Sequence, residues 1–393
     1  MKIKKLEIIG VGGIDALDVS FEPQMNLICG PNGIGKTTII ECIAHAFSHG
    51  PTNILKKNAR SELSKIRAVV ESNGEELEIE FQINTFEPNK PSGHITGLHQ
   101  FGNHLLSLKT TRIFNYQPLD AVGRDTQKEV HIIWNESRQG VSLGDVKNWF
   151  VNRYLYSAHP GALDETQMHN FELAKKSFSL LNADFSFSRV HASTNEIIIS
   201  APTGDIYYEY LSSGFKSCIS MIFGIMKEIE FRFIDPKYKF DDFDGIVLID
   251  ELELHLHPEW QSKISNVLVD VFPKVQFIST THSPHVIQSA EPRQIIALEC
   301  LDNKTAIRQL PENNYGFKGW TIEEVLIDVM GMHDTRTDIF MSTINEFSKA
   351  IESEEYDKAY AIYYNLDQLL HPQNAIRKLL KFQLAAIKEA AID

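Results

Sequence analysis

A glycine-rich segment near the amino terminus has the residue types and spacing of a phosphate-binding loop. Residues 30–37 read GPNGIGKT and match the pattern GxxxxGK[ST] at every defined position. In such loops, backbone N–H groups curl around a β-phosphate, the lysine bridges the β- and γ-phosphates, and the last hydroxyl holds Mg²⁺. The residues expected to surround the nucleotide are Gly30, Pro31, Asn32, Gly33, Ile34, Gly35, Lys36, Thr37 and Thr38. A chance glycine-rich turn is the alternative, but an apolar strand precedes the segment and a helical pattern follows it.

A pair of acidic residues ends a second apolar run, in GIVLIDELELHLHP. Two carboxylates at the end of a buried strand suit the metal and the water of phosphoryl transfer. Asp250 would hold Mg²⁺ directly or through water, and Glu251 would polarise the attacking water as a general base. An isolated Asp-Glu pair after a strand is usually only a solvated loop. The other motifs of the chain favour the catalytic interpretation here.

Two further segments could contact phosphate. In YLSSGFKS, Ser212, Ser213 and Gly214 stand at the predicted start of a helix, where hydroxyls, free N–H groups and the positive end of the helix dipole attract an anion. In FISTTHSPH, a predicted strand runs into His282. Two phosphate-binding helix starts in one chain suggest that each nucleotide is held between two copies of the protein.

The elements that must position these residues are strands with continuous rather than alternating apolarity. Such runs indicate parallel strands that are covered on both faces. They occupy residues 25–29, 246–249, 275–278 and 295–298. After the first run, TTIIECIAHAF places isoleucines and a phenylalanine on one helical stripe. Strand, glycine loop and helix in this order provide the context that a phosphate-binding loop needs.

The segment from about 60 to 210 has a different pattern. Two pairs of β-like runs surround the turn signals Asn73-Gly74 and Pro202 to Gly204, and residues 141–182 show helical spacing. We interpret 60–210 as an insertion of β-hairpins and a helical lobe between two halves of one nucleotide-binding sheet. Residues 301–393 have no strand pattern and predict a helical appendage for oligomer or partner contacts.

The amino-acid composition restricts the kinds of molecule that the chain is expected to bind. The chain of 393 residues has 52 acidic and 38 basic residues, a formal charge of -14, which disfavours a broad nucleic-acid-binding face. The basic segment LKKNARSELSKIR is most simply a solvated helix face. The scattered cysteines, the lack of a signal peptide and the short apolar runs predict a cytoplasmic protein without a membrane span.

Together the motifs resemble the heads of ABC-type ATPases, in the branch that includes RecF and SMC proteins. The resemblance covers about residues 1–300 and rests on GxxxxGKT, LSSG, the strand with Asp-Glu and the histidine after the next strand. DELELHLHP and STTHSPHVI are similar to segments of the overcoming-lysogenization-defect (OLD) ATPases. The implied fold is an α/β P-loop head: a mainly parallel sheet with an antiparallel β subdomain, an inserted helical lobe and a C-terminal helical appendage.

The resemblance also implies roles for individual residues. One ATP and its Mg²⁺ would be bound and acted on by Lys36, Thr37, Asp250, Glu251 and His282. Of these, Lys36, Glu251 and His282 would be the catalytic residues. Ser212, Ser213 and Gly214 would cap the γ-phosphate bound by the facing copy. Leu254 to His257 would match the loop that crosses the dimer seam, and Gln117 in FNYQPLD is the candidate for the glutamine that senses Mg²⁺.

OLD nucleases continue into a TOPRIM domain, which needs a DxD motif, and no DxD occurs after residue 301. The C-terminal helices, with GWTIEEVLIDVMGM, instead resemble those of stand-alone ATPases in Septu and retron-associated antiphage defence systems, where a separate HNH nuclease cuts. The resemblance implies an ATPase that dimerises around ATP and Mg²⁺ and regulates that nuclease, reaching nucleic acid through the complex. Slow turnover is compatible with this role.

Other functions stay open at this point. The first alternative is a RecF/SMC-like DNA-repair ATPase that acts directly on DNA, which would need a basic groove across the dimer. A transporter's nucleotide-binding subunit and a scaffold that binds ATP without hydrolysing it are further alternatives. A zinc site built from His255, His257, His282 and His285 is a weaker one, because no cysteine or spaced carboxylate completes it.

Overall fold

The structure is a computed structural model, and it describes residues 1–95, 97–112, 118–311, 315–332 and 335–390. The chain divides into two compact units, Met1–Met332 and His333–Asp393. The expected boundary after residue 300 lies inside the first unit, where the antiparallel hairpin of β14 (Ile295–Leu301) and β15 (Lys304–Ile307) crosses it. Each unit is described by itself below.

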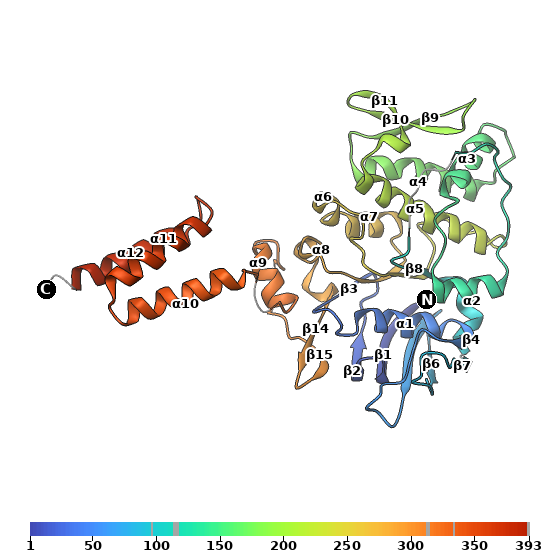
Figure 1. The fold of residues 1–393 in the computed structure, drawn as a ribbon. Coiled ribbons are helices and arrows are strands. Elements are labelled where there is room, and N and C mark those ends of the chain that lie inside the picture. The colour runs from blue at the N-terminus through green and yellow to red at the C-terminus, as the bar shows by residue number, and fades with distance from the viewer. Residues whose placement is uncertain (96, 113–117, 312–314, 333–334, 391–393) are drawn as a thin grey trace. The chain divides into compact units, whose positions relative to one another are not determined.

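A six-stranded sheet forms the centre of the first unit, in the order β15-β14-β3-β13-β12-β8 (Figure 1). The strands predicted from continuous apolarity are adjacent and parallel: β14, β3 (Met25–Cys29), β13 (Gln276–Thr280) and β12 (Ile246–Ile249). The fifth parallel strand, β8 (Leu105–Leu108), pairs with β12. The sequence analysis missed β8, which lies within the segment interpreted as an insertion. The fold is therefore a mainly parallel α/β P-loop fold.

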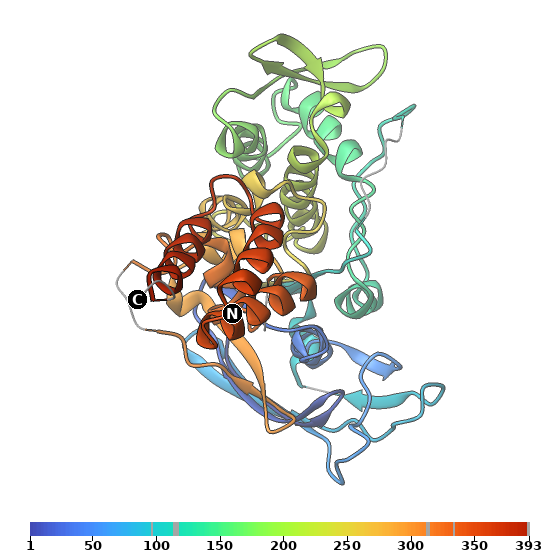
Figure 2. The ribbon, with the colours of Figure 1, turned by 60° about the vertical axis from the view of Figure 1, so that its left-hand side comes forward.

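Both faces of the central sheet are covered, which explains why its strands are apolar at every position. On β3, Leu27 and Cys29 belong to one hydrophobic core and Ile28 to the other. The Ile28 core includes α1 (Lys36–Ala46) and the antiparallel sheet. The opposite core includes α3, α4, α5 and α7. In Figures 1 and 2 the antiparallel sheet and these helices lie on opposite sides of the central strands.

The predicted hairpins are confirmed. β5 and β6 pair across Asn73-Gly74, and both turn residues have positive φ, as two-residue hairpin loops require. β10 and β11 pair around the second turn signal. The outer strands are β1 (Lys2–Val11), β2 (Ile14–Ser20), β5 (Lys65–Ser72) and β6 (Glu75–Phe81) in one sheet, β9 (Ser186–His191), β10 (Glu196–Ala201) and β11 (Gly204–Tyr207) in another, and the pair β4 (His49–Thr52) and β7 (Ser92–Ile95).

Helices complete both units. In the first unit they are α2 (Val130–Gln139), α3 (Val146–Ser157), α4 (Glu165–Leu181), α5 (Ser213–Arg232), α6 (Pro258–Gln261), α7 (Ile264–Val271), α8 (Pro284–Ser289) and α9 (Ile322–Glu324), which continues into a π-helical turn (Val325–Val329). The second unit packs α10 (Asp338–Glu352), α11 (Tyr356–Leu369) and α12 (Ile376–Ala390) around its own apolar core. No described helix combines the length and apolarity needed to span a bilayer.

Candidate functional site

The glycine loop joins β3 to α1, as the motif predicts. Gly30 and Gly35 have φ angles of 140° and 109°, a backbone region that residues with a side chain rarely adopt. A Cβ atom at Gly30 would lie 2.5 Å from the carbonyl oxygen of Leu298 on β14, and one at Gly35 would lie 2.8 Å from Ile14 on β2. Backbone conformation and close packing therefore both require glycine at these two positions.

Lys36 begins α1 and is buried, and its ammonium group points back onto the loop. It donates hydrogen bonds of 2.8 Å to the carbonyl oxygens of Gly30 and Pro31. Burial lowers the pKa of Lys36, partly opposed by the charges of Glu253, Asp250 and other nearby groups. The ammonium is thus a desolvated cation held only by neutral carbonyls, and phosphate oxygens would be better partners for it.

Thr37 and Asp250 come together beyond the ends of β3 and β12, which have β13 between them in the sheet. The Thr37 hydroxyl lies 3.3 Å from Oδ1 of Asp250, which directly follows β12. The same Oδ1 accepts a 2.6 Å hydrogen bond from the hydroxyl of Thr280, the last residue of the neighbouring strand β13. Hydroxyl and carboxylate oxygens are the ligands that Mg²⁺ prefers, so Thr37 and Asp250 fit a magnesium site.

Glu251 adopts a left-handed backbone conformation with φ of 52°. Its N–H donates to the Thr280 hydroxyl at 2.7 Å, so one threonine contacts both acidic residues of the pair. The side chain is half-buried. Because few non-glycine residues have positive φ, this conformation must be maintained by its surroundings.

Glu253 connects the loop after β12 to the loop after β13. Its carboxylate accepts hydrogen bonds from the Thr281 hydroxyl at 2.7 Å and from the His282 N–H at 2.6 Å. Partial burial and the charge of Lys36 lower the pKa of His282, against the opposing charges of Glu253 and its neighbours. His282 is therefore neutral at pH 7 and can donate a hydrogen bond from one ring nitrogen.

The Ser-Ser-Gly segment forms the start of α5. Ser212 caps the helix by accepting a 3.3 Å hydrogen bond from the N–H of Phe215, and both serines are exposed. Gly214 is buried: a Cβ atom there would lie 2.8 Å from the Trp260 ring and 3.1 Å from the N–H of His257. The helix start thus packs on the segment that follows Glu251 and presents its hydroxyls to solvent.

Comparison with known proteins shows the family of the chain. Residues 5–149 match a family model described as an AAA domain, and residues 124–287 match an AAA ATPase domain. Septu protein PtuA of Bacillus thuringiensis is 42% identical over 386 residues, which cover 98% of both chains. The chain belongs to the PtuA family of Septu proteins.

Other known proteins are similar over a smaller part of the chain or at lower sequence identity. The retron Vc95 probable ATPase of Vibrio cholerae is 36% identical to this PtuA-family chain over 106 residues, 27% of this chain and 20% of that protein. Among solved structures, the SMC head domain from Thermotoga maritima aligns with 79% of this chain and 100% of that one, at 18% identity and a TM-score of 0.47.

The structure brings one group of the predicted residues together. Lys36, Thr37, Asp250, Glu251 and His282 lie where β3, β12 and β13 end, at the edge expected of parallel strands. Of the residues Ser212, Ser213 and Gly214 at the start of α5, Gly214 packs on His257 and Trp260 instead, and the two serines are exposed. Gln117, the predicted Mg²⁺ sensor, lies outside the described residues. The histidine alternative gains no support, because the described residues contain no group of three or more His, Cys, Asp or Glu side chains placed to hold a metal.

Sequence reasoning missed the residues that support the acidic pair. Lys109 and Arg112 follow β8; Lys109 forms an ion pair with Glu41 of α1, one turn beyond Thr37. Arg112 contacts the backbone of Asp250 and Glu251. The signal for β8 in the sequence is the short run LLSL, in which Ser107 interrupts the apolar residues, and it does not reveal the pairing with β12 that places these two cations.

The basic segment at residues 55–67 is not a helix face, contrary to the expectation. Lys65 and Arg67 lie on β5 and pair across the hairpin with Glu80 and Glu78 of β6. Lys56 donates to the backbone carbonyls of residues 87 and 90. Carboxylates of β6 thus neutralise Lys65 and Arg67, two of the basic residues of this segment.

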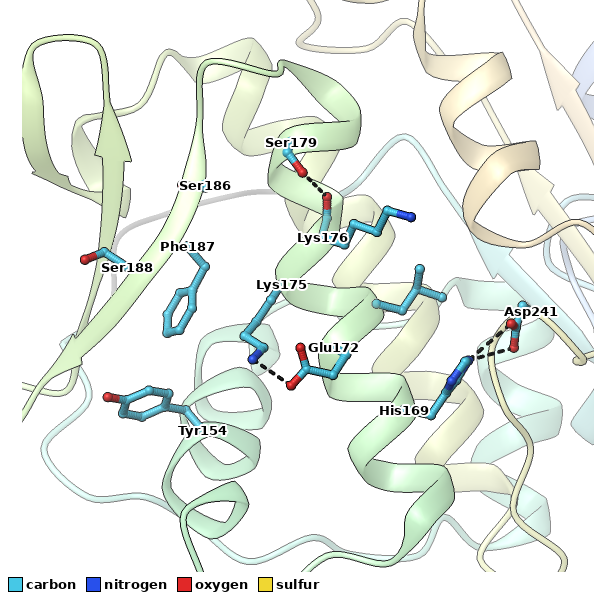
Figure 3. Close-up of a pocket in the computed structure, with 11 residues that line it drawn as sticks. Tyr154, His169, Glu172, Lys175, Lys176, Ser179, Ser186, Phe187, Ser188 and Asp241 are labelled. Atoms are coloured by element: carbon cyan, nitrogen blue, oxygen red, sulfur yellow. Dashed lines mark hydrogen bonds and ion pairs between the residues drawn. The ribbon is translucent and has the colours of Figure 1, made fainter.

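A surface hollow of about 850 Å³ lies beside α4 and β9 (Figure 3). Two pairs of side chains contact each other within it: Lys175 with Glu172 at 2.7 Å and His169 with Asp241 at 3.1 Å. Since these pairs leave little net charge, the hollow is a weaker candidate site than the strand ends around the phosphate-binding loop.

Proposed function

We propose that this chain is the ATP-binding and ATP-hydrolysing regulatory subunit of a bacterial antiphage defence complex. The observation that carries the nucleotide part is the approach of the Thr37 hydroxyl to the Asp250 carboxylate at 3.3 Å beside the buried Lys36. The likeness to Septu protein PtuA over 98% of the chain supports the defence part.

In this proposal each polar group at the strand ends has a separate role. Lys36 leaves the loop carbonyls and binds the β- and γ-phosphates, and Glu251 accepts a proton from the attacking water. His282, as a neutral imidazole, donates a hydrogen bond to the γ-phosphate. Thr37 and Asp250, with Gln117 as a third candidate, would hold Mg²⁺, which would neutralise charge that develops between the β- and γ-phosphates. Catalysis would rest on positioning and charge neutralisation.

The site is proposed to be completed by a second copy of the chain. Ser212, Ser213 and the N–H groups at the start of α5 would cap the γ-phosphate bound by the facing copy. The exposure of both serines supports this arrangement, since an intermolecular contact needs them accessible. ATP would then clamp two copies together, and its turnover would release them.

The second unit is proposed to contact other subunits, including a separate nuclease of the HNH type. Tyr360 and Tyr364 on α11 are 54% and 61% exposed, and Leu379 and Phe382 on α12 are 57% and 74% exposed. Each pair has helical i,i+4 or i,i+3 spacing, so its side chains are neighbours on the helix surface. Apolar side chains grouped in this way favour a protein contact.

The test combines single-turnover ATP hydrolysis with molar mass by light scattering, with and without ATP and Mg²⁺. Wild type should hydrolyse ATP and assemble, Lys36→Ala should do neither, and Glu251→Gln should assemble and stay assembled. Hydrolysis by Glu251→Gln at the wild-type rate would refute the general-base assignment. A mass that ATP does not change would refute the composite site.

The alternative, an ATPase that acts directly on DNA, predicts binding of duplex DNA by this subunit alone. The pairing of Lys65 and Arg67 with glutamates weighs against it, because paired side chains displace few counterions from DNA. Steep weakening of DNA binding with added salt, measured on the isolated subunit, would favour this alternative.

A further inference from the structure

A buried arginine lies directly behind the acidic pair. Arg112 is 5% exposed and follows β8, and its Nη1 donates to the carbonyl oxygens of Asp250 at 2.7 Å and Lys109 at 3.1 Å. Its Nη2 donates to the carbonyl oxygen of Glu251. One guanidinium therefore binds two consecutive carbonyls on a segment 138 residues away in sequence.

Among the described residues, no ion pair with a carboxylate balances the positive charge of Arg112. Within the part of the chain that the structure describes, the hydrogen bonds of Arg112 go to carbonyl oxygens and not to a carboxylate, and its Nε has no hydrogen-bond partner. Burial lowers the pKa of Arg112 to about 10, although the charges of Asp250, Glu253 and Glu251 oppose this effect. A buried guanidinium without an ion pair lowers the stability of the folded protein. We therefore look for a role of Arg112 other than stabilising the fold.

The conformation of Glu251 suggests what that role is. A φ of 52° is unfavourable for glutamate, and the backbone of Glu251 is fixed on both sides. Its N–H donates to Thr280, and the carbonyls of Asp250 and Glu251 both accept from Arg112. Because φ and ψ set the direction of the Cα–Cβ bond, these contacts also set the direction of the carboxylate.

We propose that Arg112 is a positioning residue for Glu251: it holds the two carbonyls so that the Glu251 carboxylate faces the water that attacks ATP. This inference rests on the proposed function, in which Glu251 is the general base. Without the guanidinium, Glu251 can relax to the right-handed backbone region and its carboxylate turns away. Arg112 contacts the backbone carbonyls of the acidic pair and not the Glu251 carboxylate, so its effect on hydrolysis passes through the backbone of Glu251.

A double-mutant cycle tests this role. Arg112→Gln should lower single-turnover hydrolysis on the order of 100-fold, the effect of misplacing a reacting group by about 1 Å. ATP affinity should stay within about twofold. In the Glu251→Gln background, Arg112→Gln should lower the residual rate by no more than about twofold, because the group that it positions is already absent. Equal losses in both backgrounds, or a matching loss of ATP affinity, would overturn the inference.

Two further variants make the test specific. Arg138→Gln is the matched control: Arg138 donates to the carbonyl oxygen of Pro51 at 2.6 Å, away from the acidic pair, and its loss should leave the rate unchanged. Arg112→Lys keeps the charge and one donor and should be intermediate, which also covers the case that Arg112→Gln does not fold. If the wild type hydrolyses no ATP, the proposed function fails, and a crystal structure of Arg112→Gln decides the inference: a Glu251 φ that stays positive overturns it.

Discussion

Replacing Thr37 by valine separates metal binding from phosphate binding. The substitution keeps the branched shape of the side chain and removes one hydroxyl. In the protein without nucleotide, that hydroxyl makes only long contacts with Asp250, 3.3 and 3.5 Å, on an exposed residue. The free energy of unfolding should therefore change by less than about 1 kcal/mol. Loss of the Mg²⁺ ligand should weaken ATP–Mg²⁺ binding by about 1.5–3 kcal/mol, or roughly 10- to 150-fold.

The assay is titration with a fluorescent ATP analogue in Mg²⁺ and again in EDTA. Thr37→Val should lose affinity in Mg²⁺ and bind within about twofold of wild type in EDTA. Thr38→Val is the control, because Thr38 is predicted to contact phosphate but not metal and should weaken binding equally in both buffers. If Thr37→Val loses the same affinity with and without Mg²⁺, the assignment of Thr37 to the metal is wrong.

The remaining predictions concern other residues of the loop and the general base. Glu251→Gln should lower the rate of hydrolysis by at least about 100-fold in a single-turnover assay while ATP binding is retained. Gly30→Ala, with φ of 140° and a Cβ only 2.5 Å from the Leu298 carbonyl, should destabilise the fold by about 1–3 kcal/mol in urea unfolding and abolish ATP binding. Burial lowers the pKa of Lys36 in the free protein and bound phosphates would raise it, so binding takes up a proton. ATP affinity should then fall by up to about tenfold per pH unit above the free-state pKa, a slope that Lys36→Met should abolish.

The central strands could be predicted from the sequence where complete burial produces an uninterrupted run of apolar residues. β3 and β12 are buried at every position, which produces the uninterrupted apolar runs. β8 has the same burial and the same length of four residues as β12, but Ser107 interrupts its apolar run, which therefore does not stand out from a loop segment. Its pairing with β12 joins residues about 140 positions apart, a relation that no local pattern contains.

The candidate site also combines residues that could be predicted from the sequence with residues that could not. The glycine loop was predictable because its function needs contiguous residues, and the positive φ angles of Gly30 and Gly35 account for the glycines of the motif. The contacts of Thr280 and Arg112 with the acidic pair were not predictable. Both depend on strand order, which places the ends of β13 and β8 on either side of the end of β12.

The hydrogen bonds of Lys36 determine which kind of ligand can replace the loop carbonyls as its partners. Its ammonium group makes two 2.8 Å hydrogen bonds to loop carbonyls, and any ligand that takes it must replace both. Hydrogen bonds from the ammonium group are charge-assisted with either acceptor, but a phosphate oxygen adds the attraction between opposite charges, which a carbonyl oxygen lacks. A neutral ligand of similar size therefore gains nothing from the exchange, whereas a polyphosphate gains at both bonds. The contacts of Lys36 with the loop thus favour a dense anion over a neutral ligand.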